Sequence, residues 1–169
     1  METNLILKIT ARFVLLILIQ VFLLNNINLM GYINPYLYVL FIILYPVTGN
    51  KTTLIILSFL LGLSIDIFEN SGGVHAAASV CIAYIRSGIL RYSFGLSYEH
   101  NNIKLSRATP AEKITYIGSM ILIHHLILFL LEVFNFNHIL LVLKSTLFSG
   151  IFSFILIYSS IVLFSRKEL

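Results

Sequence analysis

Residues 54–78 read LIILSFLLGLSIDIFENSGGVHAAA, an apolar run with one carboxylate, Asp66, near its middle. The run is long enough to enter a membrane as a helix, where a charge near the bilayer centre costs about 2.5–3.5 kcal/mol on insertion scales. Ser58 and Gly62 precede Asp66 at helical spacing, so the three residues share one helix face. This face of small and acidic residues predicts contact with protein and not with lipid.

The residues after the turn NSGG, at 70–73, continue this pattern with a second apolar segment rich in alanine. Small residues allow two helix backbones to approach closely in lipid. We therefore predict a tightly packed helical hairpin. Its helix-packing face would be formed by Ser58, Gly62, Gly73, Ala76 and Ala77.

The composition of the whole chain indicates an integral membrane protein. Of its 169 residues, 59% are hydrophobic and only 11% are charged, whereas a soluble domain carries about 25% charged residues. The net charge is +4, but the Lys and Arg residues are scattered at segment ends. We interpret them as membrane anchors and expect no nucleic-acid partner. The single cysteine excludes an internal disulfide framework.

The apolar runs predict six membrane-spanning segments, each near the length that crosses about 30 Å of hydrocarbon. They cover residues 9–24, 35–47, 53–68, 74–90, 109–134 and 139–164. The second is short and bounded by Pro35 and Pro46, so a re-entrant segment is the alternative there. The fifth begins with a capping box at Thr109 and Glu112. We expect one all-α domain over residues 1–169, a polytopic six-helix bundle with a basic cytoplasmic connector over residues 91–109.

The basic residues orient this bundle. With the N-terminus inside, ten of the 11 Lys and Arg residues fall on the cytoplasmic side, and only Lys144 falls on the other. This asymmetry follows the positive-inside rule, so we expect both termini to be cytoplasmic. Arg86 lies nearer the inner end of its segment, where a long side chain can snorkel to the membrane surface.

Few polar side chains lie within the predicted segments. Asp66, His75, His125 and Glu132 form the predicted polar cluster, which we expect to hold helices together or to contact a partner. An Asp–His pair that moves protons or binds a cation is the alternative. The sequence has neither a nucleophile next to a base nor the histidine spacing of a zinc site. We therefore predict no catalytic residue, no metal site and no cofactor.

Residues 62–78, GLSIDIFENSGGVHAAA, resemble the signature of the rod shape-determining protein MreD family. In that family the third helix carries a Gly-Leu-x-x-Asp run, followed by a glycine and small residues. The matching positions are Gly62, Leu63, Asp66, Gly73, Ala76 and Ala77. The segment LIHHLILFLLEVF, at 122–134, is similar to the version found in Bacteroidota members of the family.

The resemblance implies a non-enzymatic component of the machinery that elongates the lateral cell wall, located in the bacterial cytoplasmic membrane. By analogy, the chain would bind the bitopic membrane protein MreC and connect indirectly to MreB and to the peptidoglycan polymerase–transpeptidase pair. Members of the family are similar in fold to the substrate-binding subunits of energy-coupling-factor transporters. A solute-binding transporter subunit with an outward-facing polar cavity is therefore the alternative function.

Overall fold

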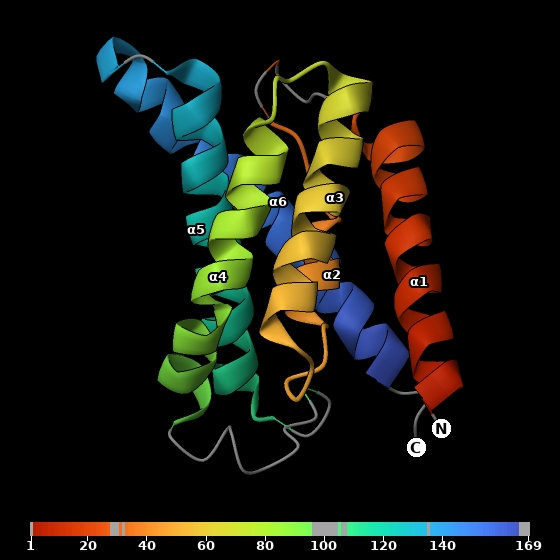
Figure 1. Ribbon diagram of the computed structural model, residues 1–169. Helices are drawn as coiled ribbons and strands as arrows, with labels where there is room; N and C mark the ends of the chain where they lie inside the picture. The colour runs from red at the N-terminus through yellow and green to blue at the C-terminus, as the bar shows by residue number, and fades with distance from the viewer. Residues whose placement is uncertain are drawn as a thin grey trace.

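The computed structural model describes residues 2–27, 31, 33–95, 105, 108–134 and 136–165 (Figure 1). In this part of the chain the regular secondary structure consists of helices. The long helices are α1 (Glu2–Ile19), α3 (Lys51–Glu69), α4 (Val74–Phe94), α5 (Pro110–Val133) and α6 (Ile139–Ser165). The short ones are the π-helical turn η1 (Gln20–Leu24), α2 (Val39–Ile43) and the 3-10 turn η4 (Phe136–His138).

The long helices run alternately up and down one bundle. In Figure 1, α1, α3 and α5 rise from the end at which α1 begins, and α4 and α6 return to it. Helix α6 is tilted and crosses behind the other helices. The start of α1 and the end of α6 therefore lie at one end of the bundle, which we call the terminal end. The opposite end, where α3 turns into α4, is the distal end.

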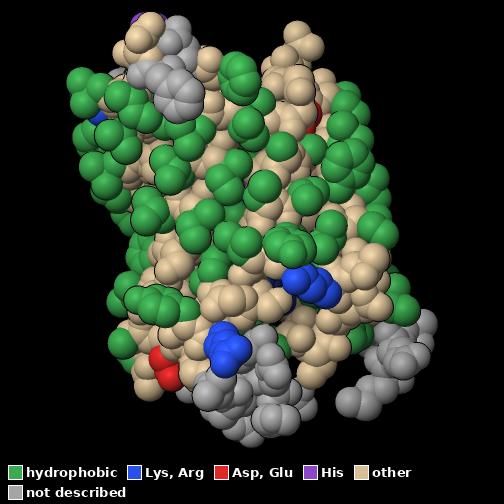
Figure 2. All heavy atoms as spheres, turned by 60° about the vertical axis from the view of Figure 1, so that its left-hand side comes forward, with side chains coloured by type: hydrophobic (Ala, Val, Ile, Leu, Met, Phe, Trp, Pro, Cys, Tyr) green, Lys and Arg blue, Asp and Glu red, His purple; other side chains and the backbone are tan. Residues whose placement is uncertain are grey.

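Four helices are long and apolar enough to cross a membrane. They cover Leu5–Leu24, Lys51–Glu69, Pro110–Val133 and Ile139–Leu163, and they match four of the six predicted segments. Hydrophobic side chains cover the flank of the bundle in Figure 2, a surface suited to contact with lipid. Helix α4 has a sufficient length of 21 residues, but its Ser, Arg and His residues make it less apolar. The six-span count is therefore not confirmed within the described residues.

The segment expected to span residues 35–47 is not one continuous helix. Residues 34–36 have no regular structure, α2 covers only five residues, and the chain turns again at residues 44–45. Pro35 and Pro46 lack the N–H groups that a longer helix would need. The segment still passes from the distal to the terminal end, with α2 behind α3 in Figure 1. All five residues of α2 are buried, so this broken segment crosses inside the bundle, as its apolar character on all sides favours.

Side chains of neighbouring helices bind the free backbone groups in the distal half of the broken segment. Gln20 binds Leu37 N–H and Pro35 C=O, Ser149 Oγ binds Asn34 N–H, and Ser153 Oγ binds Tyr36 N–H, at distances of 2.8–3.1 Å. An unpaired backbone group away from water costs several kcal/mol. These contacts therefore allow a non-helical chain to lie in the interior.

Arg86 of α4 binds the carbonyl groups at the C-terminal end of α2. Its side chain is only 6% exposed. The guanidinium donates hydrogen bonds to Tyr45 C=O, to Ile43 C=O at 3.4 Å and to the Tyr116 hydroxyl at 2.9 Å. Tyr116 also donates to Ile43 C=O, at 3.1 Å. The prediction that Arg86 snorkels to the surface is wrong, because the carbonyl groups freed where α2 ends need its donors.

The predicted connector over residues 91–109 lies mostly outside the described residues. Helix α4 extends into it as far as Phe94, and Thr109 at its other end caps α5. Thr109 Oγ1 accepts a hydrogen bond from Glu112 N–H, and the Glu112 carboxylate accepts one from Thr109 N–H at 2.7 Å. The predicted capping box is confirmed.

Candidate functional site

Asp66 caps the N-terminus of α4 from the neighbouring helix. The N-cap residue of α4 is Gly73, which has no side chain to do this. Instead, Asp66 Oδ1 accepts from His75 N–H at 3.0 Å, and Oδ2 accepts from Ala76 N–H at 2.9 Å. These are the second and third N–H groups of the helix, the ones that an N-cap side chain binds. The carboxylate thus satisfies buried donors and lies at the positive end of the helix dipole.

The imidazole of His75 lies between two carboxylates. Its Nδ1 is 3.0 Å from Asp66 Oδ1, and its Nε2 is 3.1 Å from Glu69 Oε2. Ser71 Oγ donates a hydrogen bond to Asp66 Oδ1 at 2.6 Å. Asp66 and His75 are 4% and 2% exposed, respectively. The turn between α3 and α4 is therefore held by a compact set of polar contacts, in which Asp66 and His75 are buried and Glu69 and Ser71 are half-buried.

Asp66, Ser71 and His75 are the residue types of a hydrolytic triad, but their geometry differs from one. In a triad, the serine and the acid bind opposite nitrogens of the imidazole, so that the ring can take the proton of the serine. Here Ser71 Oγ and Asp66 Oδ1 both lie next to Nδ1, at 3.1 and 3.0 Å, and the serine donates to the acid directly. This arrangement stabilises the turn and does not support nucleophilic catalysis.

Two tyrosines of the broken segment connect the hairpin to α5. The Tyr36 ring lies between two histidines, with centroid distances of 5.4 Å to His75 and 5.3 Å to His125. The Tyr38 hydroxyl is 2.8 Å from Nε2 of His124. Both histidines of α5 are fully buried. The polar interior therefore extends from α3 through the broken segment to α5.

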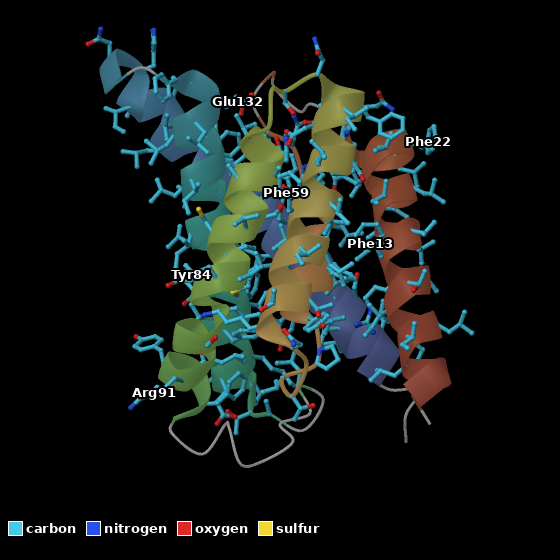
Figure 3. The ribbon with its side chains drawn as sticks, in the orientation of Figure 1. Phe13, Phe22, Phe59, Tyr84, Arg91 and Glu132 are labelled. Carbon is cyan, nitrogen blue, oxygen red and sulfur yellow. The ribbon has the colours of Figure 1, made fainter. Side chains whose placement is uncertain are left out.

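The structure brings three of the four residues of the predicted polar cluster to this site. Asp66 and His75 are in direct contact, and His125 joins them through Tyr36. Glu132 is exposed in the last turn of α5 (Figure 3). It stands one residue before the end of the helix at the distal end, in contact with none of these three residues, although its charge is near enough to act on His75 and Glu69.

Gly62 lies where α3 and α4 are in closest contact. A Cβ atom on Gly62 would be 2.5 Å from both Ala76 Cα and the His75 carbonyl oxygen. Ser58 and Ala76 are also buried. These three residues of the predicted helix-packing face therefore lie in the interior, with Gly62 directly against Ala76.

The other two residues of the predicted helix-packing face do not belong to it. Gly73 has a φ of 95°, a left-handed conformation that glycine adopts readily, and open space surrounds the position of its missing Cβ. It therefore serves the turn into α4 and not the packing. Ala77 is exposed, because it points about 100° away from Ala76 around the helix.

The sequence pattern did not reveal several buried partners of this site. These are Gln20, Tyr36, Tyr38 and Ser153. Gln20 alone gave a usable signal, since it is the one amide in the apolar run FVLLILIQVFLL at 13–24. A polar residue in such a run is typically paired within the protein.

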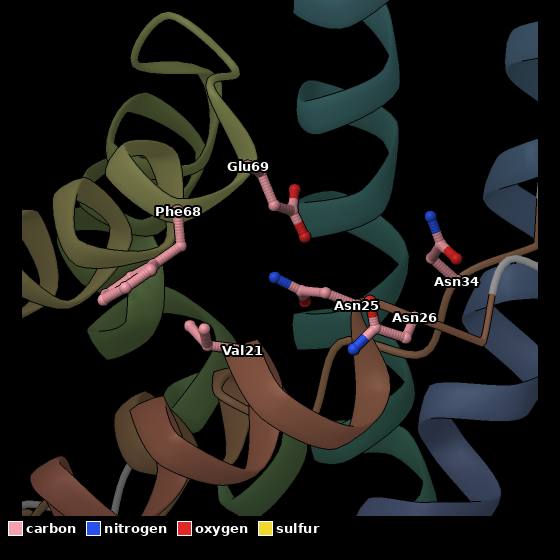
Figure 4. A pocket seen from close by; sticks show the side chains of 6 residues that line it. All are labelled: Val21, Asn25, Asn26, Asn34, Phe68 and Glu69. Atoms are coloured by element: carbon pink, nitrogen blue, oxygen red, sulfur yellow. The ribbon is translucent and has the colours of Figure 1, made fainter.

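A cavity of about 370 Å³ lies beside this site at the distal end (Figure 4). We call it the distal cavity. It is lined by Val21, Asn25, Asn26, Asn34, Phe68 and Glu69. Glu69 links it to the buried interior through the contact of its carboxylate with His75. Within the described residues, no three His, Cys, Asp or Glu side chains gather in a way that would hold a metal ion.

Comparisons of the chain with protein-family models, with curated proteins and with solved structures found no match.

Proposed function

We propose that this protein is a non-enzymatic membrane scaffold of the bacterial cell-wall elongation machinery, as in the MreD family that residues 62–78 resemble. The observation that carries the proposal is the cap that Asp66 places on α4. The acid that is central to the resemblance is used to join two helices, and its polar neighbours are bonded to one another. This use of the acid fits a protein that presents a stable surface to partners.

The packing around the hairpin supports the same function. Gly62 contacts the backbone of α4 directly, and the broken segment fills the centre of the bundle with buried side chains such as Tyr38 and Phe41. Among the described residues, these side chains occupy the centre of the bundle, where a transport route would have to pass. This filling favours a rigid platform over a transport route.

We further propose that the protein lies in the cytoplasmic membrane with both termini in the cytoplasm. The start of α1 and the end of α6 lie at the same end of the bundle, which supports this orientation (Figure 1). The distribution of Lys and Arg also supports it. The direct partner would be an MreC-type bitopic protein, through which the scaffold connects to MreB and to the peptidoglycan polymerase and transpeptidase.

The test is co-purification of the full-length chain with the MreC-type protein of the same organism, expressed together and extracted in a maltoside detergent. We expect a stable complex with the wild-type chain. We also expect a weaker one with Asp66→Asn, since the amide cannot supply a charge at the α4 N-terminus. Glu112→Gln, the same change at the other end of α5, is the control and should keep full binding, since glutamine also completes a capping box. No complex with the wild-type chain would contradict the proposal.

The distal cavity favours one alternative, a solute-binding subunit of a transporter, because its lining is largely polar. The two functions differ in what a deletion strain should show. Loss of a scaffold of wall elongation turns rods into rounded cells in any medium. Loss of a transporter subunit leaves the cell shape unchanged and creates a requirement for the solute.

A further inference from the structure

The hairpin of α3 and α4 carries its opposite charges at opposite ends. Its acids, Asp66 and Glu69, lie in the last turn of α3 at the distal end, and α4 contains no Asp or Glu. At the terminal end, Lys51 is the first residue of α3 and Arg91 lies in the last turn of α4. Both of these side chains are exposed. The terminal end of the hairpin is therefore positively charged.

No acid balances these two cations within the part of the chain that the structure describes. Neither Lys51 nor Arg91 forms an ion pair with a carboxylate there. The ammonium group of Lys51 lies instead over the ring of Tyr84, 4.3 Å from its centroid. A cation–π contact of this kind positions the ammonium group and leaves its charge in place. Tyr84 is 63% exposed, so the charge is held on the outer side of the hairpin.

The two cations flank an open position on α4. Tyr84, Gly88 and Arg91 are spaced four and three residues apart, so they share one face of the helix. Gly88 has open space around the position of its missing Cβ. From Tyr84, where the ammonium group of Lys51 lies, to Arg91 the helix rises by about 10 Å. This face therefore leaves room for a phosphate group between the two cations.

The surroundings of this face are suited to a lipid. Figure 2 shows Lys and Arg side chains towards the terminal end of the flank, with hydrophobic side chains covering the surface above them. On α3, Ile56 and Leu60 follow Lys51 towards the distal end and are 54% and 44% exposed. Tyr92, next to Arg91, is 79% exposed, and tyrosine is typical of the boundary between membrane and water. An anion that approaches along this flank therefore carries apolar chains.

We propose that the terminal end of the α3–α4 hairpin binds the headgroup phosphate of an anionic phospholipid, with Lys51 and Arg91 as its cationic contacts. Both side chains donate charge-assisted hydrogen bonds to phosphate oxygens, and basic residues at a membrane surface attract anionic lipids. A zwitterionic lipid fits less well, because its own ammonium group would lie near two cations. This site goes beyond the scaffold function and does not rest on it.

The test is native mass spectrometry of the full-length protein, released from a maltoside detergent and titrated with one lipid at a time. The probes are phosphatidylglycerol and phosphatidylcholine with identical acyl chains, so that only the headgroup differs. We expect the first phosphatidylglycerol to bind at least tenfold more tightly than the first phosphatidylcholine, a difference of about 1.4 kcal/mol.

Variants then separate a defined site from a general attraction of the basic end to anionic lipid. Lys51→Gln and Arg91→Gln should each weaken binding of phosphatidylglycerol at least threefold and change binding of phosphatidylcholine less than twofold. The control is Lys8→Gln, which removes the same charge from an exposed residue of α1. In Figure 1, α1 lies on the other side of α3 from α4, and its start is at the same end of the bundle. Lys8→Gln should therefore change binding of either lipid less than twofold.

Each outcome decides the proposal. Preference for phosphatidylglycerol that is lost in Lys51→Gln and Arg91→Gln and kept in Lys8→Gln supports the site. Equal affinity for the two lipids, or unchanged binding by the two hairpin variants, would overturn it. An equal loss in Lys8→Gln would also overturn it, since the attraction would then be general. Displacement of phosphatidylglycerol by an equal concentration of inorganic phosphate would identify the free ion as the ligand and overturn the lipid.

Discussion

The Asp66 carboxylate accepts a hydrogen bond from the Ala76 N–H at 2.9 Å, and through this contact one long helix caps the next. A charged group inside an apolar helix is expensive unless it has partners. Here the partners are backbone donors that themselves need an acceptor. The Asp66 carboxylate and the N-terminus of α4 therefore each supply the hydrogen-bonding partner that the other needs.

Replacing Asp66 with alanine should destabilise the protein by about 2–4 kcal/mol, since it removes the cap of α4 and leaves buried donors unpaired. Asp66→Asn should cost less, because the amide oxygen still accepts one bond. The measurement is thermal unfolding in detergent. Ser64→Ala is the control, as Ser64 is only half-buried and its hydroxyl donates to Leu60 C=O of its own helix. Equal melting temperatures for Asp66→Ala and this control would contradict the cap.

Gly62→Ala should destabilise the protein by about 1–3 kcal/mol, because the added methyl group would meet the α4 backbone at 2.5 Å. Gly88→Ala provides the matched control. Gly88 lies inside α4 with open space around its missing Cβ, so alanine there should be neutral or stabilise by up to about 1 kcal/mol. In thermal unfolding, the melting temperature should therefore fall in Gly62→Ala and stay the same or rise in Gly88→Ala. A shared shift would mean that α3 and α4 are not in close contact at Gly62.

Arg86→Leu should cost about 2–4 kcal/mol, since it leaves the carbonyl groups of Ile43 and Tyr45 without their donor. Arg86→Lys should recover only part of this loss, because an ammonium group lacks the planar fork of donors. Arg91→Leu, an exposed change in the last turn of the same helix, should stay within about 0.5 kcal/mol. Retained stability of Arg86→Leu would show that the broken segment does not need this donor.

Two serines of α6 offer a comparison of the same substitution in one helix. Ser153 Oγ accepts the Tyr36 N–H at 2.8 Å and lies 3.0 Å from His125 Nε2, whereas Ser160 donates to Leu156 C=O of its own helix. Ser153→Ala should cost about 1–3 kcal/mol through the unpaired N–H, and Ser160→Ala less than about 0.5 kcal/mol. Hydrogen exchange at the Tyr36 amide should also become faster in Ser153→Ala. Equal melting temperatures of the two variants would show that the contact of Ser153 with the broken segment does not stabilise the protein.

The sequence was sufficient for features that depend on nearby residues. The apolar runs located four helices that are long and apolar enough to cross a membrane, and Thr109 with Glu112 located the start of α5. The hairpin turn at residues 70–73 was also visible in its glycines. Such features follow from spacing over one or two helical turns.

The broken segment and its partners could not be read in the same way. An apolar run such as residues 35–47 fits a spanning helix and a buried irregular segment equally well. The side chains that permit the irregular form come from distant parts of the chain, as with Tyr36 and Ser153, which are 117 residues apart. The same reason explains the wrong prediction for Arg86. The carbonyl groups that it binds, those of Ile43 and Tyr45, are more than 40 residues away in the sequence.

The dependence of the broken segment on distant side chains bears on the order in which the protein folds. Its N–H groups at residues 34 and 36 find their acceptors in α6, which is synthesised more than 100 residues later. Until α6 arrives, these groups need water, which is scarce in the bilayer. We therefore expect the second crossing in the chain to be the last to reach its final place, with α6 closing over a segment made long before it.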